Sequence, residues 1–540
     1  MSKTNKKDKN KDNGLDNSRL VHWADVVVKR VIAQKGDKKK YVVAAGITPS
    51  GVVHIGNFRE IITVDLVAKA FRDAGKEVRF IYSWDDYDVL RKVPKNMPNQ
   101  DMLKKHLRKP IVDIPDPFGT EDSYARHHEV DVENDIDKVD IRPEFLYQAK
   151  KYRKLEYVDG IRTALKNTRK IKEILDQYRK EPLEQGWMPL SGYCPECNKY
   201  DVTFSDYDGN NMLRMTCSEC NKTYDVDIRK APYLKLPWRI DWPMRWAHER
   251  VDFEPGGKDH STVGGSYYTA KDIVTLFDWE APSYEKYDFV SIKGLGGKIS
   301  SSIGNVITLR ECLEIYEPEI VRYLFAGTQP KSEFAISFDL DVIKIYEDFD
   351  KCERVYFGEE TIKEKKLAKE KRIYELSCVK EVPKKMPFQP SFRHLTNVIQ
   401  TYSFDEKRIL DYYKNNLKSK DDEGRLKKRM LCAENWLKKY APDDFKYEIQ
   451  TEIKKQDMDE NMKKIFSEII GILEKKEWNE EDLHSKFYEI ARNNNVEPPD
   501  FFKSAYNILV NKERGPKLAH FIIMIGQKKV AEMFSKAIGE

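Results

Sequence analysis

Short apolar runs alternate with a helix-like stretch in the first part of the chain after position 20. Tyr41 to Ala45 is apolar throughout, and Val78 to Tyr82 is apolar except for Arg79; each predicts a buried strand. Residues 58–74 between them have helical character and are followed by Gly75, a common helix terminator. Strand, helix and strand in this order predict a βαβ unit in a parallel sheet, with a ligand at the carboxyl ends of the strands.

The pattern changes twice further along the chain. Residues 95–235 are more polar and contain a proline-rich loop at 114–117, a long charged stretch with helical character at 143–180, and a group of cysteines. The α/β pattern resumes over 238–324, and beyond Phe334 only helical periodicity remains. We therefore expect an α/β fold in which a parallel sheet of the Rossmann type carries an insertion and is followed by an all-α region.

The predicted boundaries follow these changes of pattern. They are a disordered arm (1–19), the first half of the sheet domain (20–115), an insertion (116–235) that includes the cysteine module (190–224), the second half of the sheet domain (236–333), a helical connector (334–385) and an all-helical region (386–540).

Composition excludes some classes of protein and leaves nucleic acid open as a partner. The chain has 95 Lys and Arg against 90 Asp and Glu, a net charge of +5, so a basic surface has to come from local clustering. Apolar runs such as Phe521 to Ile525 are far shorter than the roughly 18 residues of a membrane span. The first nineteen residues contain no apolar block that resembles a signal core. We expect a cytoplasmic protein that does not bind a membrane.

Four of the eight cysteines form the most specific chemical pattern in the chain. Cys194 and Cys197 make one Cys-x-x-Cys pair, Cys217 and Cys220 make another, and nineteen residues separate the pairs. This is zinc-ribbon spacing, and four thiolates leave no open position for catalysis, so a structural Zn²⁺ is predicted. A redox pair is the alternative. The other four cysteines are scattered and do not suggest a disulfide framework.

Two further motifs together predict a site for a nucleoside triphosphate. His54-Ile55-Gly56-Asn57 follows the first strand and opens the helix, where the backbone can approach a ligand and the helix dipole favours phosphate. Lys298-Ile299-Ser300-Ser301-Ser302 follows a glycine-rich stretch and supplies a cation, hydroxyl donors and free amides. Taken alone, the first motif is better explained as a strand-turn-helix corner with a capping histidine, and the second can be a glycine- and serine-rich surface loop. Both together, in this order, favour the nucleotide site.

These motifs resemble the HIGH and KMSKS signatures of the class I aminoacyl-tRNA synthetases. Further stretches resemble the class I lysyl-tRNA synthetases in particular, the type typical of archaea and some bacteria. They are Gly46 to Gly51, His54 to Glu60, Trp84 to Asp88, Arg91 to Pro94, Ile114 to Gly119, Ser123 to Ala125, Trp238 to Trp246, Gly257 to His260, Gly264 to Ser266 and Arg514 to Leu518. The first signature ends in Asn57, as is common in the lysyl group. Ser301 stands where KMSKS has its second lysine, which leaves Lys298, with His54 and Mg²⁺, to carry more of the phosphate charge.

The resemblance implies a reaction and a set of ligands. The carboxylate of L-lysine attacks the α-phosphorus of ATP, which is bound with Mg²⁺, and lysine then passes to the terminal adenosine of tRNA(Lys). Because this needs no protein nucleophile, the site works by positioning and charge stabilisation. The helical region would bind the anticodon.

The resemblance also implies roles for individual residues. Those implied to be catalytic are His54, Asn57, Lys298 and Ser300. Those implied to bind ATP are His54, Gly56, Asp259, Gly264, Gly265, Lys298, Ser301 and Ser302. Those implied to bind lysine are Gly46, Thr48, Trp238, His260 and Tyr287, with Asp85 and Asp86 as nearby anions. Without the resemblance, Trp238 and Tyr287 read as core residues.

Two other functions remain open at this point. A glutamyl-type synthetase shares the overall plan, but the Trp84-Asp85-Asp86 stretch and the 238–246 stretch argue against it. A catalytically silent tRNA-binding relative would fit Ser301, but the intact His54 and Lys298 argue against it. Asp116 and His127 form a second candidate metal pair beside residues that are poor soft ligands. The anticodon contacts, the oligomeric state and any need for tRNA in lysine activation do not follow from the sequence.

Overall fold

The computed structural model describes residues 22–293 and 306–539, which fall into two compact units. Unit 1 holds the described residues up to Leu313 together with Pro318–Ile336 and Cys352–Val382. Unit 2 holds Glu314–Glu317, Ser337–Lys351 and the described residues from Pro383 onward. The predicted disordered arm and the Lys298 to Ser302 motif lie outside the described residues.

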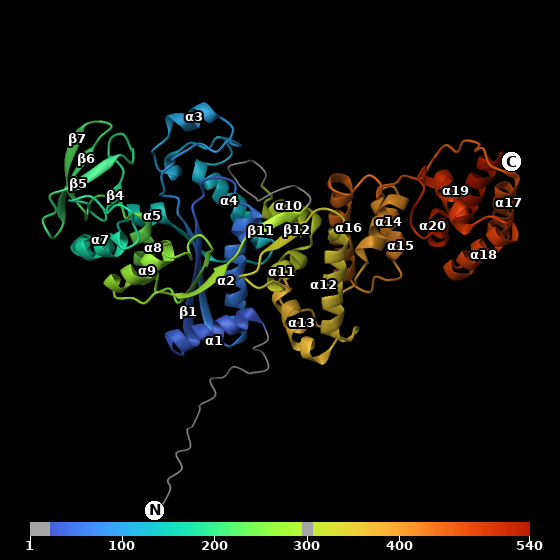
Figure 1. Ribbon diagram of the computed structural model, residues 1–540, viewed down its shortest axis with the longest axis horizontal. Helices are drawn as coiled ribbons and strands as arrows, with labels where there is room; N and C mark the ends of the chain where they lie inside the picture. Colours follow the sequence, from blue (N-terminus) through green and yellow to red (C-terminus); the bar gives the residue numbers. More distant parts are fainter. Residues whose placement is uncertain (1–21, 294–305, 540) are drawn as a thin grey trace, which may run out of the picture. The chain divides into compact units, whose positions relative to one another are not determined.

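A five-stranded parallel sheet that includes β1 forms the centre of unit 1 (Figure 1). Its strand order is β10-β9-β1-β2-β3. Its strands are β1 (Lys40–Ile47), β2 (Glu77–Trp84), β3 (Glu144–Tyr147), β9 (Phe253–Gly257) and β10 (Ser283–Tyr287). The predicted parallel sheet is thus confirmed. Later strands add on both sides of β1, so the order switches between β1 and β9, and open α/β sheets bind ligands at such a point.

Helices cover both faces of this sheet. α2 (Ile55–Asp73) packs on one face, where the rings of Tyr41 and Phe71 stack with centroids 4.6 Å apart. α8 (Trp238–Glu249) and α9 (Ser266–Ile273) cover the other face, where Trp242 and Trp246 pack with Ala44 of β1. α1 (Trp23–Lys35) lies against α2 and β10. Burial on both faces explains why β1 is a continuous apolar run rather than an alternating one.

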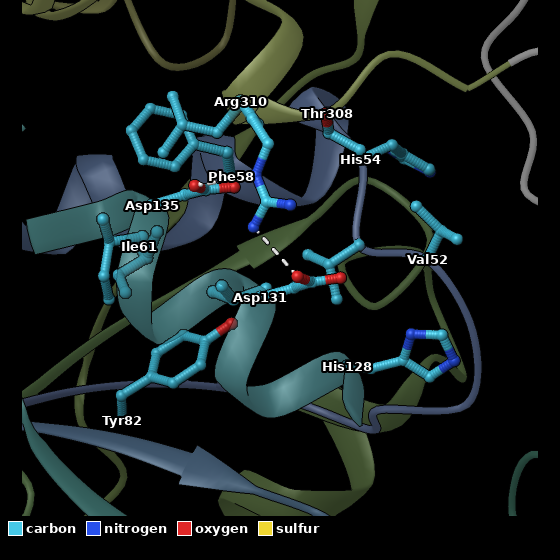
Figure 2. Close-up of a pocket in the computed structure, with 14 residues that line it drawn as sticks. Val52, His54, Phe58, Ile61, Tyr82, His128, Asp131, Asp135, Thr308 and Arg310 are labelled. Atoms are coloured by element: carbon cyan, nitrogen blue, oxygen red, sulfur yellow. Dashed lines mark hydrogen bonds and ion pairs between the residues drawn. The ribbon is translucent and has the colours of Figure 1, made fainter. Parts of the chain in front are cut away.

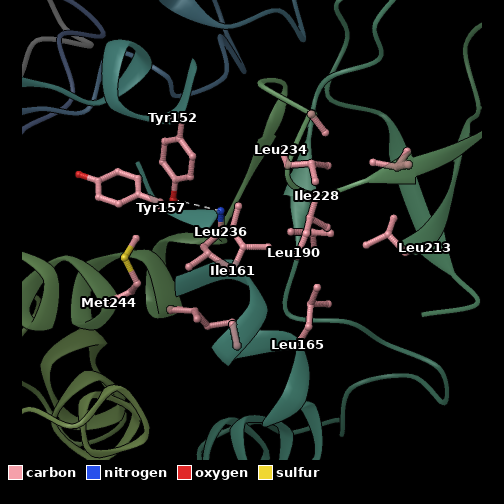
Figure 3. Packing of buried hydrophobic residues seen from close by; sticks show 14 of the residues in the cluster. Tyr152, Tyr157, Ile161, Leu165, Leu190, Leu213, Ile228, Leu234, Leu236 and Met244 are labelled. Carbon is pink, nitrogen blue, oxygen red and sulfur yellow. Dashed lines mark hydrogen bonds between the residues drawn. The ribbon is translucent and has the colours of Figure 1, made fainter. Parts of the chain in front are cut away.

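The stretch predicted to be helical at 143–180 is helical over most of its length, but it begins with a strand and is divided into three helices. The chain forms β3 and then three short helices, α5 (Gln148–Arg153), α6 (Val158–Lys166) and α7 (Thr168–Asp176). Residues 144–147 gain a place beside β2 in the sheet, and Leu155 breaks the helical path with a φ of 62°. The breaks let Tyr152, Tyr157 and Ile161 face one core (Figure 3).

The cysteine module is a small antiparallel sheet within unit 1, and the same core joins it to the rest of the unit. The sheet consists of β5 (Val202–Ser205), β6 (Met212–Cys217) and β7 (Lys222–Asp227), and β4 (Ser191–Gly192) pairs with β8 (Leu234–Lys235). Leu213 of β6 belongs to the same buried cluster as Leu234 of β8 and Met244 of α8 (Figure 3). The module is therefore anchored on the helix that covers the central sheet.

The other elements of the 22–382 stretch complete unit 1 or bridge the two units in sequence. They are α3 (Gln100–Lys105), η2 (Ile111–Asp113), α4 (Tyr124–Asp137), η3 (Val274–Phe277), β11 (Val290–Lys293), α10 (Leu309–Ile315), α11 (Pro318–Ala326), β12 (Phe334–Ser337), α12 (Asp341–Phe357) and α13 (Glu364–Ser377). β11 pairs with β12.

Unit 2 is helical, and no strand follows Ser337 in the described part of the chain, although β12 occupies the first four residues of the predicted helical connector. Its helices beyond α12 are α14 (Phe392–Thr401), α15 (Glu406–Tyr413), α16 (Lys420–Lys439), α17 (Glu460–Lys475), α18 (Glu480–Asn493), α19 (Pro498–Val510), α20 (Leu518–Ile525) and α21 (Gln527–Ile538). In neither described stretch does a helix have both the length and the apolar character needed to cross a membrane.

Candidate active site

His54 caps the helix that follows β1. Its ring Nδ1 accepts a hydrogen bond from the Asn57 N–H (3.3 Å), and the Asn57 Oδ1 accepts one from the His54 N–H (3.2 Å). This capping box explains why α2 begins at Ile55, earlier than the sequence predicted. Burial lowers the pKa of His54, so the ring is neutral at pH 7. Because Nδ1 accepts a bond, the proton is on Nε2, which leaves a neutral donor beside a helix N-terminus that favours phosphate.

Two glycines fix the geometry of this turn. A Cβ on Gly56 would lie 2.9 Å from both Cε1 and Nδ1 of the His54 ring, so any side chain there would displace the imidazole. A Cβ on Gly46 would lie 2.8 Å from the backbone oxygen of Ser83, so β1 and β2 approach closely at their carboxyl ends. Glycine at 46 and 56 is thus required by packing, whether or not a ligand is bound.

The loop after β9 lies on the other side of the switch point. β9 pairs with β1 through Phe253 and Val43 and ends at Gly257, so residues 258–260 leave the sheet at the same edge as Thr48. The loop folds back on itself, since the Gly265 N–H donates to the oxygen of Thr262 (2.8 Å). A Cβ on Gly265 would lie 2.5 Å from the backbone oxygen of His260, which excludes a side chain.

A carboxylate that the sequence analysis did not single out joins two of the predicted lysine-binding residues. Glu60 accepts hydrogen bonds from the Gly46 N–H (3.0 Å) and from the Tyr287 hydroxyl (2.6 Å). Burial raises its pKa to about 7. None of the ion pairs of the described residues includes Glu60. One signal was available, because Glu60 is an acidic residue inside the apolar part of α2.

Asp85 and Asp86, the anions predicted to lie near lysine, already have partners. An Asp85 oxygen lies 2.6 Å from Nη1 of Arg245, a buried ion pair. Asp86 accepts a hydrogen bond from the Ala149 N–H (2.7 Å), and burial raises its pKa to about 8. Asp85 is therefore neutralised by arginine, and Asp86 is protonated at pH 7.

Thr48 is tied to a second ion pair. Its hydroxyl donates to Asp88 (3.0 Å), and Asp88 lies 2.6 Å from the buried ammonium of Lys235. These contacts hold the turn after β1 to β8. Asp85 and Asp88 are thus both paired with cations, whereas Glu60 takes part in no ion pair among the described residues.

Tryptophans of α8 form a wall that links Trp238 with His260. Trp238 is 38% exposed and stacks on Trp242, with ring centroids 5.1 Å apart. The Trp242 and His260 ring centroids are 6.0 Å apart. Trp242 and Trp246 donate from their indole N–H groups to Glu254 (3.0 and 2.5 Å), so the wall is rigidly held.

A cavity of about 70 Å³ adjoins His54 (Figure 2). Its lining is mostly apolar, and Phe58 of α2 and Tyr82 of β2 contribute to it. Arg310 pairs with Asp131 of α4 beside it (2.9 Å). His128 also lines the cavity; its Nε2 has no hydrogen-bond partner in the described structure, and burial lowers its pKa to about 4.

The four predicted metal ligands lie together in the cysteine module. The Sγ atoms of Cys194 and Cys220 are 3.4 Å apart, those of Cys197 and Cys217 are 3.7 Å apart, and all four lie within 4.8 Å of one another. A tetrahedral ion with metal–sulfur bonds of about 2.3 Å requires sulfur separations of about 3.8 Å. The geometry therefore fits a four-thiolate metal site.

Asp116 and His127 lie together, with the His127 Nδ1 3.4 Å from an Asp116 oxygen, but they do not belong to a group of three or more possible ligands in the described part of the chain. The Asp116 carboxylate accepts backbone N–H bonds from Phe118 (3.0 Å), Thr120 (2.8 Å) and Glu121 (2.9 Å), so it organises its own loop. Over the described ranges, the cysteine cluster is the only group of three or more such side chains placed to hold a metal ion.

Comparison with known proteins places the chain in a family. Residues 21–380 match the family model for class I (K) tRNA synthetases, and residues 435–538 match that of an anticodon binding domain. The chain belongs to the class I (K) tRNA synthetases.

Relatives of this synthetase match it over nearly its whole length. A lysine–tRNA ligase of Borreliella burgdorferi is 48% identical over 96% of this chain and 100% of its own. Those of Treponema pallidum and Thermococcus kodakarensis are 44% and 42% identical, and each match covers 95% of this chain and 98% of the relative. A solved glutamate tRNA ligase of Elizabethkingia meningosepticum matches 93% of this chain and 99% of its own at 11% identity, with a TM-score of 0.44.

The described site residues of the synthetase gather at one edge of its central sheet. Gly46 lies near the end of β1, Thr48 and His54 follow that strand, and Gly56 and Asn57 are in the first turn of α2. Asp259, His260, Gly264 and Gly265 follow β9, Trp238 opens α8, and Tyr287 ends β10. Lys298, Ser300, Ser301 and Ser302 lie outside the described residues. The roles given to these residues remain predictions.

Proposed function

We propose that this synthetase is an ATP-dependent lysine–tRNA ligase. It activates L-lysine with ATP to lysyl-adenylate and pyrophosphate, and then transfers lysine to the 3′-terminal adenosine of tRNA(Lys). The observation that carries the proposal is the Glu60 carboxylate, which lies without a cation beside the switch point of the sheet. The names of the relatives, lysine–tRNA ligase at 42% to 48% identity, support it.

Glu60 suits the side chain of lysine. An ammonium group needs an anion or neutral acceptors when it leaves water, and Glu60 with the Tyr287 hydroxyl supplies both. Trp238 and His260 offer ring faces for the aliphatic stem. Glutamate, the substrate of the alternative enzyme, would meet a like charge at Glu60, which disfavours binding.

The His54 turn suits the phosphates of ATP. The neutral Nε2–H of His54 would donate to a phosphate oxygen without changing protonation, and Gly56 leaves room for the imidazole ring in this position. Asp259 would orient the ribose of ATP, and the backbone at Gly264 and Gly265 would contact the nucleotide. Lys298, Ser300, Ser301 and Ser302 would close over the phosphates, and Asn57 keeps His54 in place. Mg²⁺ bound with ATP would offset phosphate charge.

The two remaining parts bind zinc and tRNA. We assign a structural Zn²⁺ to Cys194, Cys197, Cys217 and Cys220, because four thiolates at this spacing form a closed site. The helices within residues 435–538 would bind the anticodon of tRNA(Lys).

The test is pyrophosphate exchange into ATP with each of the twenty amino acids, with and without tRNA. Exchange that depends on lysine supports the proposal. Exchange with glutamate would replace it with the glutamyl alternative, and a chain that binds tRNA but exchanges with no amino acid would be the silent relative.

A further inference from the structure

A segment after β2 carries most of the excess positive charge of the chain. Residues 91–109, here called the 91–109 lobe, contain seven Lys and Arg against one acid, Asp101. The whole chain has a net charge of only +5, so the rest of the protein has no positive excess. The basic residues are Arg91, Lys92, Lys95, Lys104, Lys105, Arg108 and Lys109.

Four of these cations are exposed and outside the ion pairs of the described residues. Within the lobe, Lys104 pairs with Asp101 (2.9 Å) and Arg108 pairs with Asp201 (2.5 Å). Arg91, Lys92, Lys95 and Lys105 are exposed, and no described acid lies within ion-pair distance of them. Such a concentration of unpaired charge of one sign attracts a polyanion.

The 91–109 lobe packs against the turn that leads to His54. Two backbone hydrogen bonds join the ends of the lobe: the Leu90 N–H donates to the Lys109 oxygen, and the Arg108 N–H donates to the Leu90 oxygen, both at 2.9 Å. Leu90 belongs to a small buried core with Tyr124, the first residue of α4.

Two contacts then reach the turn itself. The Tyr124 hydroxyl donates to the Ser50 oxygen (2.7 Å). The Pro94 ring lies 3.8 Å from where a Gly51 Cβ would be. The lobe also leaves the sheet at the carboxyl end of β2, the edge that holds the candidate active site (Figure 1).

We propose that the 91–109 lobe binds the phosphates of the acceptor end of tRNA. This rests on the proposed function, because the terminal adenosine must reach lysyl-adenylate beside His54. The nucleotides just before it then pass the turn on which the lobe sits. Lysine and arginine contacts with phosphate position a nucleic acid without reading its sequence, and they weaken as salt rises.

The test compares two variants that each remove four positive charges. The lobe variant combines Arg91→Gln, Lys92→Gln, Lys95→Gln and Lys105→Gln. The control combines Lys29→Gln, Lys40→Gln, Lys365→Gln and Lys366→Gln, which are equally exposed and also outside the ion pairs of the described residues. The control positions lie on α1, at the amino end of β1 and on α13. A general loss of electrostatic attraction would affect both variants alike.

We expect the lobe variant to raise the KM for tRNA about tenfold or more at low salt. The slope of log KM against log salt should fall by about 0.7 to 0.9 for each phosphate that the lobe no longer neutralises. The control should stay within about twofold of wild type with an unchanged slope, and a third variant with Lys and Arg exchanged at the four lobe positions should bind normally. Wild-type KM and slope in the lobe variant would overturn the proposal.

Two further measurements keep the outcome clear. If the lobe variant melts below wild type, the pair Lys92→Gln and Lys95→Gln is measured in its place, with a smaller reduction of slope expected. An RNA hairpin that carries only the acceptor stem should show the same weakening of binding as full tRNA; a weakening seen only with full tRNA would contradict the placement. If the wild type charges no lysine, the proposed function fails, whereas direct tRNA binding still measures the lobe.

Discussion

His54 holds the first turn of α2 and supplies a hydrogen-bond donor with the same ring. Nδ1 satisfies the Asn57 N–H, and this fixes the proton on Nε2. A mutation that removes the ring therefore changes two properties, the stability of the helix start and the chemistry at the phosphate. Asparagine can separate them, because it is among the best capping residues and has no imidazole.

We predict that His54→Ala lowers the free energy of unfolding by about 1 kcal/mol, whereas His54→Asn leaves it near wild type. Both should slow lysyl-adenylate formation by about a hundredfold or more, because both remove a donor to developing phosphate charge. Urea unfolding and pyrophosphate exchange measure the two effects. Wild-type exchange in His54→Asn would show that the residue acts only as a cap.

Glu60 should make lysine binding depend on pH. Its pKa of about 7 means that the carboxyl is protonated below pH 7 and anionic above it. An ammonium binds the anion, so the KM for lysine should fall as pH rises from 6 to 8. Glu60→Gln should raise the KM for lysine about 10- to 100-fold at pH 8 and flatten its pH profile, with the KM for ATP unchanged.

Glu254→Gln is the matched control for Glu60. Burial also raises the pKa of Glu254 to about 7, but two indole N–H groups occupy its oxygens. We expect its pH profile to follow wild type. A flat profile in Glu254→Gln and a normal one in Glu60→Gln would move the ammonium site to Glu254.

At the scale of single elements, the cysteine module depends on its metal. β5, β6 and β7 are short, and most of their side chains are exposed or half-buried, so a bound ion should stabilise the module substantially. Cys197→Ser should reduce the zinc content from about one ion per chain to near zero and accelerate hydrogen exchange in β5 to β7. Cys378→Ala, at a cysteine far from the cluster in sequence, should keep its zinc. Full zinc in Cys197→Ser would rule out the four-thiolate site.

The elements that sequence predicted well are those whose signal is local. β1 and β2 are buried on both faces, which produces continuous apolar runs, and the cysteine spacing is set by the geometry of one small module. The strand at the start of the 143–180 stretch was missed because the helical composition of the stretch continues through β3, and β3 exists only through its pairing with β2. Glu60 was missed because its partner Tyr287 is 227 residues away on β10. The sequence around Glu60 carries no signal for a contact with a residue so far along the chain.

At the scale of whole units, the core of unit 2 is tied together by one buried arginine. Arg429 of α16 is fully buried, and its guanidinium lies 2.7 Å from Glu317 and 2.9 Å from Asp350. These acids come from the two short segments that join unit 2 from earlier in the chain. The arginine thus connects three parts of unit 2 that are distant in sequence.

We predict that Arg429→Met destabilises unit 2 by about 3 to 5 kcal/mol, because it leaves buried carboxylates without their cation. Lys427→Met, on the same helix, removes an exposed pair with Glu423 and should have a much smaller effect on stability, because exposed ion pairs contribute little. Hydrogen exchange in α14 and α16 measures both effects. Equal exchange rates in the two variants would show that the buried network contributes little.

The contact between position 56 and the imidazole limits how this turn can evolve. A methyl group at 56 would lie 2.9 Å from the ring of His54, so the two positions cannot vary independently. Alanine at 56 becomes sterically acceptable only after the ring has gone, and the donor goes with it. Selection for activity therefore has no single-step path that enlarges residue 56, and a randomised library of 54 and 56 should return histidine and glycine as a pair.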